Sequence, residues 1–130
     1  MNPGLLDGIT LAYIGDSVME LYIRKKLVNA GVSGSRDLNA HAQKIVNAAA
    51  QAAAFHKIKD ILTEEENEIF KRGRNCGHIN LPKHAKMVDY RIATGFEALL
   101  GFLCLSDRES RAIELLDIAV TLPIETEEEK

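Results

Sequence analysis

Residues 11–22 read Leu-Ala-Tyr-Ile-Gly-Asp-Ser-Val-Met-Glu-Leu-Tyr, and this stretch is the strongest indication of the fold class. At about 3.6 residues per turn it forms a helix that is apolar on one side, with Asp16 on the other side. That second side is apolar as well, and such a helix is buried or lies at an interface. Burying a lone carboxylate is costly, so we expect Asp16 to have a cation or a metal ion as its partner. The first stripe consists of Leu11, Ile14, Val18, Leu21 and Tyr22, and the second of Ala12, Met19, Ile23 and Leu27.

A second acid stands alone in an apolar run. Glu97 is the only charged residue in residues 92–105, Ile-Ala-Thr-Gly-Phe-Glu-Ala-Leu-Leu-Gly-Phe-Leu-Cys-Leu. Its helical face carries small residues such as Gly101, and Gly15 stands next to Asp16, so two helices can approach closely there. Two carboxylates in one buried site repel unless a divalent cation holds both. We therefore expect the two helices to share a site; the alternative is that each acid makes an ordinary buried hydrogen bond or ion pair.

The rest of the chain also has helical signals, and no segment shows the two-residue period of a strand. Ser35 is a good N-cap, and Thr63 with Glu66 and Ser106 with Glu109 form capping-box patterns. The sequence therefore predicts an all-α fold. The expected helices cover residues 9–29, 36–61, 64–71, 84–105 and 107–121.

Composition sets limits on function. The chain of 130 residues fits one domain, residues 1–124, followed by an acidic tail at 125–130 that we expect to be disordered. The net charge of −3 resides in that tail, and the aromatic content of 5% with no Trp argues against a base-stacking surface. Two cysteines, no CxxC pair and no signal peptide indicate a reduced cytoplasmic setting, and no run is long enough to span a membrane.

Residues 70–91 are rich in bases: the segment contains six lysines and arginines and only one acid, Asp89. Such side chains on a loop suit phosphate oxygens, although an ordinary solvated loop explains them too. A zinc site built from Cys76, His78 and His84 lacks a fourth ligand and fits no strong metal pattern. The bases are Lys71, Arg72, Arg74, Lys83, Lys86 and Arg91.

Two motifs resemble those of a known family. Residues 13–21, Tyr-Ile-Gly-Asp-Ser-Val-Met-Glu-Leu, resemble the ribonuclease III signature, and residues 96–101, Phe-Glu-Ala-Leu-Leu-Gly, resemble its second motif, which carries a metal-binding Glu. The resemblance extends over residues 11–105. Residues 72–75, Arg-Gly-Arg-Asn, and the form of residues 90–97 are similar to the short bacterial branch, Mini-ribonuclease III, which lacks a double-stranded-RNA-binding domain.

The chain departs from the longer members of that family at two acids. Ala12 and Thr94 stand where those members have a Glu and an Asp. We therefore expect one tightly held ion, with a second recruited by the RNA phosphate.

The resemblance implies a Mg²⁺-dependent endonuclease that cuts double-stranded RNA and leaves 5′-phosphate and 3′-hydroxyl ends. Asp16 and Glu97 would be the catalytic metal ligands, with Glu20 in support. It further implies a homodimer that matures the precursor of large-subunit (23S) ribosomal RNA, with a ribosomal protein presenting the substrate. The candidate RNA-binding residues are Arg72, Arg74, Asn75, Lys83 and Lys86.

Three alternatives remain. The first is a catalytically silent ribonuclease III-like module that binds RNA or the ribosome, which the missing acids favour. The second is an all-α dimeric interaction protein, which the neutral charge of residues 1–124 favours. The third, a hydrolase of small nucleotides, is disfavoured because no adjacent His-Asp pair occurs.

Overall fold

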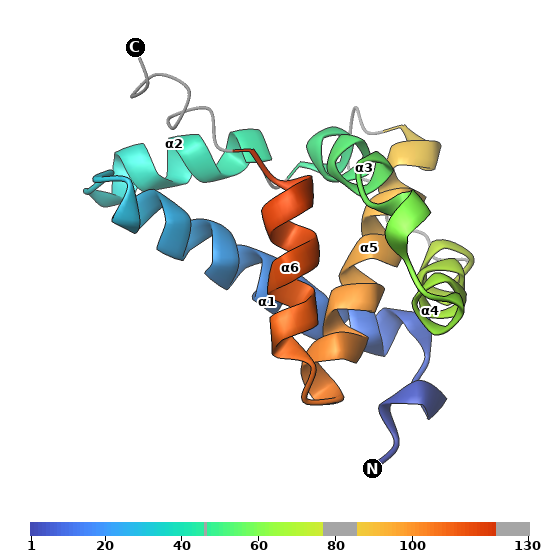
Figure 1. Cartoon of the computed structure of the whole chain (residues 1–130). Helices are drawn as coiled ribbons and strands as arrows, with labels where there is room; N and C mark the ends of the chain where they lie inside the picture. The colour runs from blue at the N-terminus through green and yellow to red at the C-terminus, as the bar shows by residue number, and fades with distance from the viewer. Residues whose placement is uncertain (46, 77–85, 122–130) are drawn as a thin grey trace.

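The computed structural model describes residues 1–45, 47–76 and 86–121 (Figure 1). Within these residues, all regular secondary structure is helical. The prediction of an all-α fold is confirmed. The expected acidic tail and part of the expected basic loop lie outside these residues. The elements are η1 (Pro3–Leu5), α1 (Gly8–Asn29), α2 (Ser35–Ile45), α3 (Ala48–His56), η2 (Lys59–Ile61), α4 (Glu64–Arg74), α5 (Met87–Leu105) and α6 (Glu109–Ala119).

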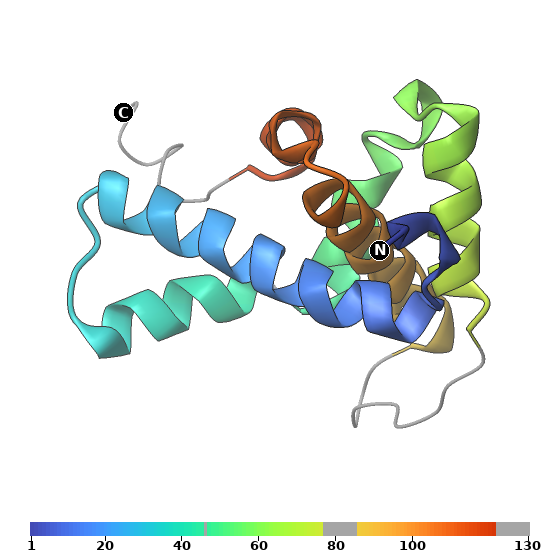
Figure 2. The same cartoon turned by 90° about the horizontal axis from the view of Figure 1, so that it is seen from below.

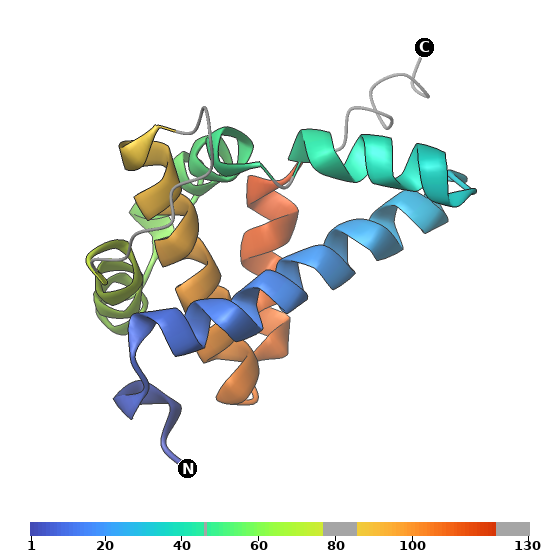
Figure 3. The ribbon, with the colours of Figure 1, turned by 180° about the vertical axis from the view of Figure 1, so that it is seen from behind.

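Helix α5 is the centre of the core. It packs against α1, α3, α4 and α6, and Figures 2 and 3 show α1 crossing it on one side while α3 and α4 lie at its N-terminal half. Its apolar side chains Phe96, Leu99, Leu100 and Leu103 are 0% exposed. Because α5 is apolar nearly all round, it is enclosed by other helices, as the sequence predicts. No described helix has the length and apolar character to cross a membrane.

Glycines bring α1 and α5 into direct backbone contact. A methyl group on Gly15 would overlap the carbonyl oxygen of Glu97, and one on Gly101 would overlap the carbonyl oxygen of Leu11. A glycine in a helix interior costs about 1 kcal/mol of helix stability relative to alanine. The close packing of α1 against α5 offsets this cost at Gly15 and Gly101. The expectation that small residues let these two helices approach is confirmed.

The expected single helix over residues 36–61 is wrong. Helix α2 ends at Ile45, and α3 begins at Ala48 after an N-cap residue, Asn47, whose side chain accepts a hydrogen bond from the Ala50 backbone N–H at 2.8 Å. Asn favours caps over helix interiors because its short side chain bonds the nearby backbone. The break lets α3 turn away from α2 and lie against α5 (Figure 3).

Of the two expected capping boxes, only one is formed. The Thr63 hydroxyl accepts from the Glu66 N–H at 3.1 Å, and the Glu66 carboxylate accepts from the Thr63 N–H at 2.9 Å, which is the predicted reciprocal pair. Ser106 instead caps the C-terminus of α5, and α6 begins after Arg108, which makes no side-chain cap. The intervening Asp107 has φ 59°, so the chain turns before α6 can start.

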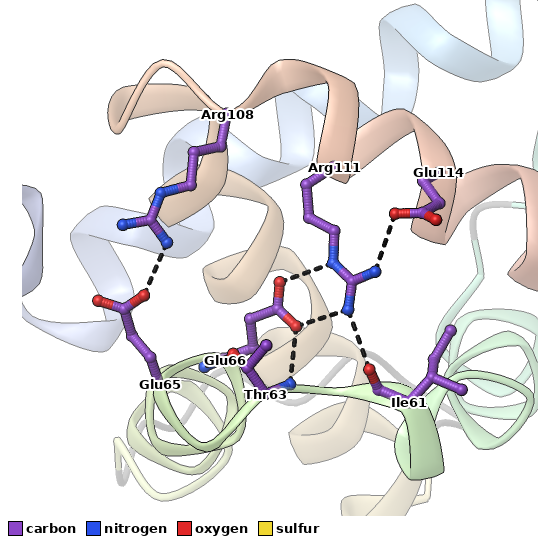
Figure 4. Close-up of polar contacts among 7 residues, drawn as sticks. All are labelled: Ile61, Thr63, Glu65, Glu66, Arg108, Arg111 and Glu114. Atoms are coloured by element: carbon purple, nitrogen blue, oxygen red, sulfur yellow. Dashed lines mark hydrogen bonds and ion pairs between the residues drawn. The ribbon is translucent and has the colours of Figure 1, made fainter.

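Glu66, the acid of this capping box, also joins α4 to α6 through an ion pair with Arg111 (Figure 4). Glu66 is 3% exposed, and its two carboxylate oxygens accept hydrogen bonds from Nε and Nη2 of Arg111, each at 2.8 Å. The Arg111 guanidinium holds the pKa of Glu66 below its ordinary value and also donates to the Ile61 carbonyl at 2.9 Å. Nearby, Arg108 pairs with Glu65 at 2.6 Å. The N-terminus of α4 is thereby fixed on the side of α5 covered by α6.

Candidate active site

The crossing of α1 and α5 brings the two predicted acids together. Gly15 packs on the backbone of Glu97, so Asp16, the next residue of α1, lies beside the Glu97 side chain. Burial first, and then a hydrogen bond with Asp16 and the charge of that carboxylate, raise the pKa of Glu97 to about 8. A pair of interacting carboxyl groups binds a proton more tightly than either alone. The two acids predicted from separate helices thus lie next to each other in the structure.

Asp16 itself is exposed, so the expectation that it is a buried acid is wrong. The buried side of α1 is the second of the two predicted stripes, in which Met19, Ile23 and Leu27 are each 1% exposed. Asp16 lies at the rim of that side, open to solvent. In the first stripe only Leu11 is fully buried, and Leu21 is 56% exposed. Both faces of α1 are apolar in sequence, and the pattern alone does not show which one meets α5.

No cation pairs with either acid among the described residues, because every ion pair in that part of the chain joins other groups. Glu20, the predicted supporting acid, accepts from Arg24 Nε at 2.9 Å, one helical turn along α1. Its charge nevertheless contributes to the raised pKa of Glu97, which places it near the pair. In the part of the chain that the structure describes, Asp16 and Glu97 are therefore not neutralised by a protein cation, whereas Glu20 is paired with Arg24.

Gln51 is a site residue that the sequence prediction missed. It lies on α3, is 4% exposed, and its side-chain amide lies close to the Glu97 carboxyl group, where it lowers the pKa of that acid and partly offsets the raised value. One signal was present in the sequence: Gln51 is the only polar side chain in residues 48–55, Ala-Ala-Ala-Gln-Ala-Ala-Ala-Phe. A lone amide in a buried alanine run needs a polar partner.

The residues at this site fit a hard divalent cation. Asp16 and Glu97 offer carboxylate oxygens from two helices. Within residues 1–45, 47–76 and 86–121, no group of three or more His, Cys, Asp and Glu side chains is arranged to hold a metal. Mg²⁺ keeps several waters and binds through one or two carboxylates together with substrate phosphate, so two acids suffice for it. The zinc alternative stays untested, since His78 and His84 lie outside the described residues.

The predicted RNA-binding residues fall at different places. Arg72 is exposed and lies against the N-terminal segment, where its Nη1 donates to the carbonyls of Gly4 at 2.6 Å and Leu6 at 2.9 Å. Arg74 donates to the Asn75 side chain at 3.1 Å, at the end of α4. Lys86 is exposed directly before α5, and Lys83 lies outside the described residues. The structure thus gives Arg72 a role in fixing the N-terminal segment.

Arg74 also lines a basic groove between α3, α4 and α5, with a volume of about 460 Å³. The other cationic side chains in its wall are Lys59 and Arg91, His56 lies beside them, and no acid is among the lining residues. We call this surface, defined by His56, Lys59, Arg74 and Arg91, the basic groove. Of its three cations, Arg74 and Arg91 belong to the basic segment noted in the sequence, and Lys59 does not.

The metal-free protein is expected to lose stability between about pH 4.5 and pH 8 because of Glu97. This group has an ordinary pKa of 4.5 in the unfolded chain and a pKa of about 8 in the fold, so the folded state holds the extra proton in that range. Its contribution to the free energy of unfolding is fully present below about pH 4.5 and is lost as the pH rises through 8. Glu97→Gln removes this titration. The free energy of unfolding of the variant should therefore fall less than that of the wild type as the pH rises from about 4.5 to 8.

Urea denaturation of both proteins in EDTA at pH 5.5 and 8.5 measures the effect. Groups remote from Asp16 and Glu97 titrate alike in the two proteins, so the difference between them reports on this pair of acids. Equal pH dependence in the two proteins would contradict the raised pKa.

Comparison with known proteins agrees with this arrangement. Residues 9–108 match the model of the ribonuclease III domain. The chain is 42% identical over 118 residues to a Mini-ribonuclease 3 of Symbiobacterium thermophilum, with 91% of each chain covered. It is 40% identical over 125 residues to a Mini-ribonuclease 3 of Enterococcus faecalis, with 95% of each covered. A crystal structure of a Fusobacterium nucleatum protein superposes with a TM-score of 0.80 at 32% identity, covering 88% of this chain and 91% of that one.

The family match covers both acids and the two helices that carry them. The chain therefore belongs to the ribonuclease III family, in its Mini-ribonuclease III branch, and is an endoribonuclease.

Proposed function

We propose that the protein cleaves double-stranded RNA with Mg²⁺ held by Asp16 and Glu97. The observation that carries this proposal is the pair of carboxyl groups from α1 and α5, which interact with each other and have no protein cation among the described residues. A divalent cation between them would relieve the repulsion that raises the pKa of Glu97. The silent-module alternative is disfavoured because both acids of the two motifs are present and adjacent.

The two acids have different surroundings, which suits different tasks. Glu97 is held by the core and by Gln51, so it gives the site a fixed position. Asp16 faces solvent, where a phosphate of the RNA backbone can approach. When bound, Mg²⁺ supplies a more acidic water and stabilises charge on the leaving 3′ oxygen. Glu20, at the edge of the site, would orient a water molecule. The products would carry 5′-phosphate and 3′-hydroxyl ends.

The test is incubation of a long RNA duplex with the protein in Mg²⁺ or in EDTA, beside a single strand of the same sequence. We expect cutting of the duplex only, and only with Mg²⁺. Binding without cutting in Mg²⁺, Mn²⁺ and Co²⁺ would instead support the silent module. No binding at either low or high salt would support the interaction protein.

We propose that the RNA backbone lies along Arg74, Asn75, Lys83 and Lys86 and enters the basic groove. Cations there come from three elements and face no acid in the lining, so a row of phosphates complements them. Arg72 contributes by fixing η1 against α4 rather than by contact. Double-stranded RNA is recognised largely through its shape and its phosphates, so the interaction is expected to be weakly sequence-dependent.

Neutralising the basic groove is expected to weaken RNA binding in a salt-dependent way. Each lost phosphate contact lowers the slope of log K against log salt concentration by about 1. Arg74→Gln with Arg91→Gln should therefore lower the slope by about 2. Lys25→Gln, an exposed lysine of α1 outside the groove, is the matched control. Titration of a duplex at several KCl concentrations measures the slope, and an unchanged slope would remove the groove from the binding surface.

We propose that the protein is a homodimer joined near the N-terminus of α1. Leu5 is 82% exposed, Ile9 is 50% exposed and Tyr13 is 77% exposed. Residues 5–13 therefore present a large apolar surface to solvent. Exposed apolar clusters of this kind mark interfaces, and an isologous pair gives one active site for each RNA strand.

Placing a charge in that patch is expected to separate the subunits. Tyr13→Glu would bury an unpaired carboxylate in an apolar interface, so the variant should sediment as a monomer at concentrations where the wild type is a dimer. Ser17→Glu, one helical turn further along α1, adds the same charge outside the apolar patch and should sediment like the wild type. A wild-type protein that is already monomeric would contradict the dimer.

We propose that the biological substrate is the 23S ribosomal RNA precursor in the cytoplasm, with a ribosomal protein presenting it. Residues 1–124 carry no net charge, so binding to bare RNA is expected to be weak and to benefit from a helper. Mapping of 23S RNA ends in cells with and without the protein tests this assignment. Unchanged ends would exclude it without affecting duplex cleavage itself.

A further inference from the structure

We propose that Gln51 is a positioning residue, whose side-chain amide holds the Glu97 carboxylate in place for the divalent cation. The proposal rests on the proposed metal site at Asp16 and Glu97. It assigns a function to α3, which carries none of the residues in the two family motifs.

The burial of Gln51 is the first argument. In the described part of the chain, Gln51 at 4% exposed and Glu66 at 3% exposed are the polar residues that the core encloses. Glu66 is explained by its capping box and by Arg111. Gln51 lies inside α3 rather than at a helix end, and its side-chain amide lies close to the Glu97 carboxyl group. Burying an amide is costly unless it is hydrogen-bonded, and Glu97 is the acceptor that we infer for it.

The register between α3 and α5 is the second argument. Phe55, one turn after Gln51, packs against Phe96 at 5.8 Å between ring centroids and stacks on Phe70 at 3.9 Å. Residues four apart on a helix lie one above the other. The contact of Phe55 with Phe96 therefore fixes how Gln51 meets the next residue of α5, Glu97. The Asn47 cap begins α3 one turn earlier, which completes the placement.

The chemistry of an amide is the third argument. An amide N–H donates to a carboxylate without neutralising it, so the negative charge stays available to a cation. A lysine or arginine at this position would compete with the metal, and an acid would add to the repulsion. Outer partners of this kind orient metal-binding carboxylates, and their loss commonly lowers metal affinity by about 10- to 100-fold.

The test is Gln51→Met, which keeps the length and volume of the side chain and removes the hydrogen bond. Mg²⁺ binding to the RNA-free protein is measured by calorimetry, and cleavage is followed against Mg²⁺ concentration. We expect affinity for Mg²⁺ to fall by about tenfold or more. We also expect kcat to return to near the wild-type value when Mg²⁺ is saturating. Arg111→Met, which loses the ion pair to Glu66 far from the site, is the control for reduced stability and should keep the wild-type Mg²⁺ requirement.

Two results would overturn the proposal. One is a Gln51→Met protein with the Mg²⁺ affinity of the wild type, and the other is a loss of kcat that saturating Mg²⁺ does not restore. If the variant does not fold, the side-chain amide resonance of Gln51 in the wild type replaces it, and a resonance that Mg²⁺ does not shift would be the contradicting result. Absence of Mg²⁺-dependent cleavage by the wild type would instead contradict the proposed function.

Discussion

Asp16→Asn and Glu97→Gln are each expected to lower the rate of duplex cleavage by about 10³-fold or more. A catalytic metal ion is worth several kcal/mol of transition-state stabilisation, and each 1.36 kcal/mol is a factor of ten in rate. An amide oxygen in place of either carboxylate keeps the shape of the site and removes one of its two negative charges. The measurement is single-turnover cleavage of an RNA duplex at saturating Mg²⁺.

The two variants also carry their own control for folding. Burial and Asp16 raise the pKa of Glu97, so Glu97→Gln should be at least as stable as the metal-free wild type at pH 8. A variant that is more stable and yet inactive separates the loss of chemistry from the loss of structure. Retained cleavage in either variant would contradict the assignment of that acid. Glu20→Gln is expected to have a smaller effect, because Glu20 is paired with Arg24.

Gly15→Ala is expected to destabilise the protein by about 1–2 kcal/mol and to reduce cleavage as well. The added methyl group would overlap the carbonyl oxygen of Glu97, which is backbone and cannot rotate away. Overpacking of this kind typically costs about 1–3 kcal/mol, and it is opposed by a gain in helix propensity of about 1 kcal/mol. Because the overlap is with Glu97, one of the two proposed metal ligands, moving α1 outward also separates Asp16 from Glu97.

Ser17→Ala is the matched control for this variant, since Ser17 is exposed two residues further along the same helix. That substitution gains helix propensity without meeting α5, so stability should be equal or slightly higher. Urea denaturation and cleavage rates of both proteins measure the two effects. A Gly15→Ala protein with wild-type stability would show that the helices are less closely packed than this crossing requires.

The sequence predicted the class of fold and the pair of acids because both depend on local patterns. The apolar run around Glu97 can only be an enclosed helix, and Gly15 and Gly101 are informative because glycine is otherwise unfavourable there. Which face of α1 is buried was not predictable, since both faces are apolar and the choice depends on α5. This is why Asp16 was expected to be buried and is exposed.

The remaining differences come from short side chains that compete with the helix. Asn47 divides the expected helix over residues 36–61, because its side chain caps α3 and so favours a new helix start at that point. Gln51 was missed for the same reason, because only the break directs α3 toward Glu97. The roles of Arg72 and the basic groove depend on contacts between distant segments, which a residue pattern does not contain.

The backbone contact between α1 and α5 has a consequence for engineering. Because Gly15 packs on the main chain at Glu97, the separation of the two acids depends directly on a backbone contact between α1 and α5. Volume-conserving exchanges of apolar residues between α5 and α6 are therefore expected to leave the two proposed metal ligands in place. Attempts to raise thermostability should accordingly begin at the α5–α6 contact and leave the glycines untouched.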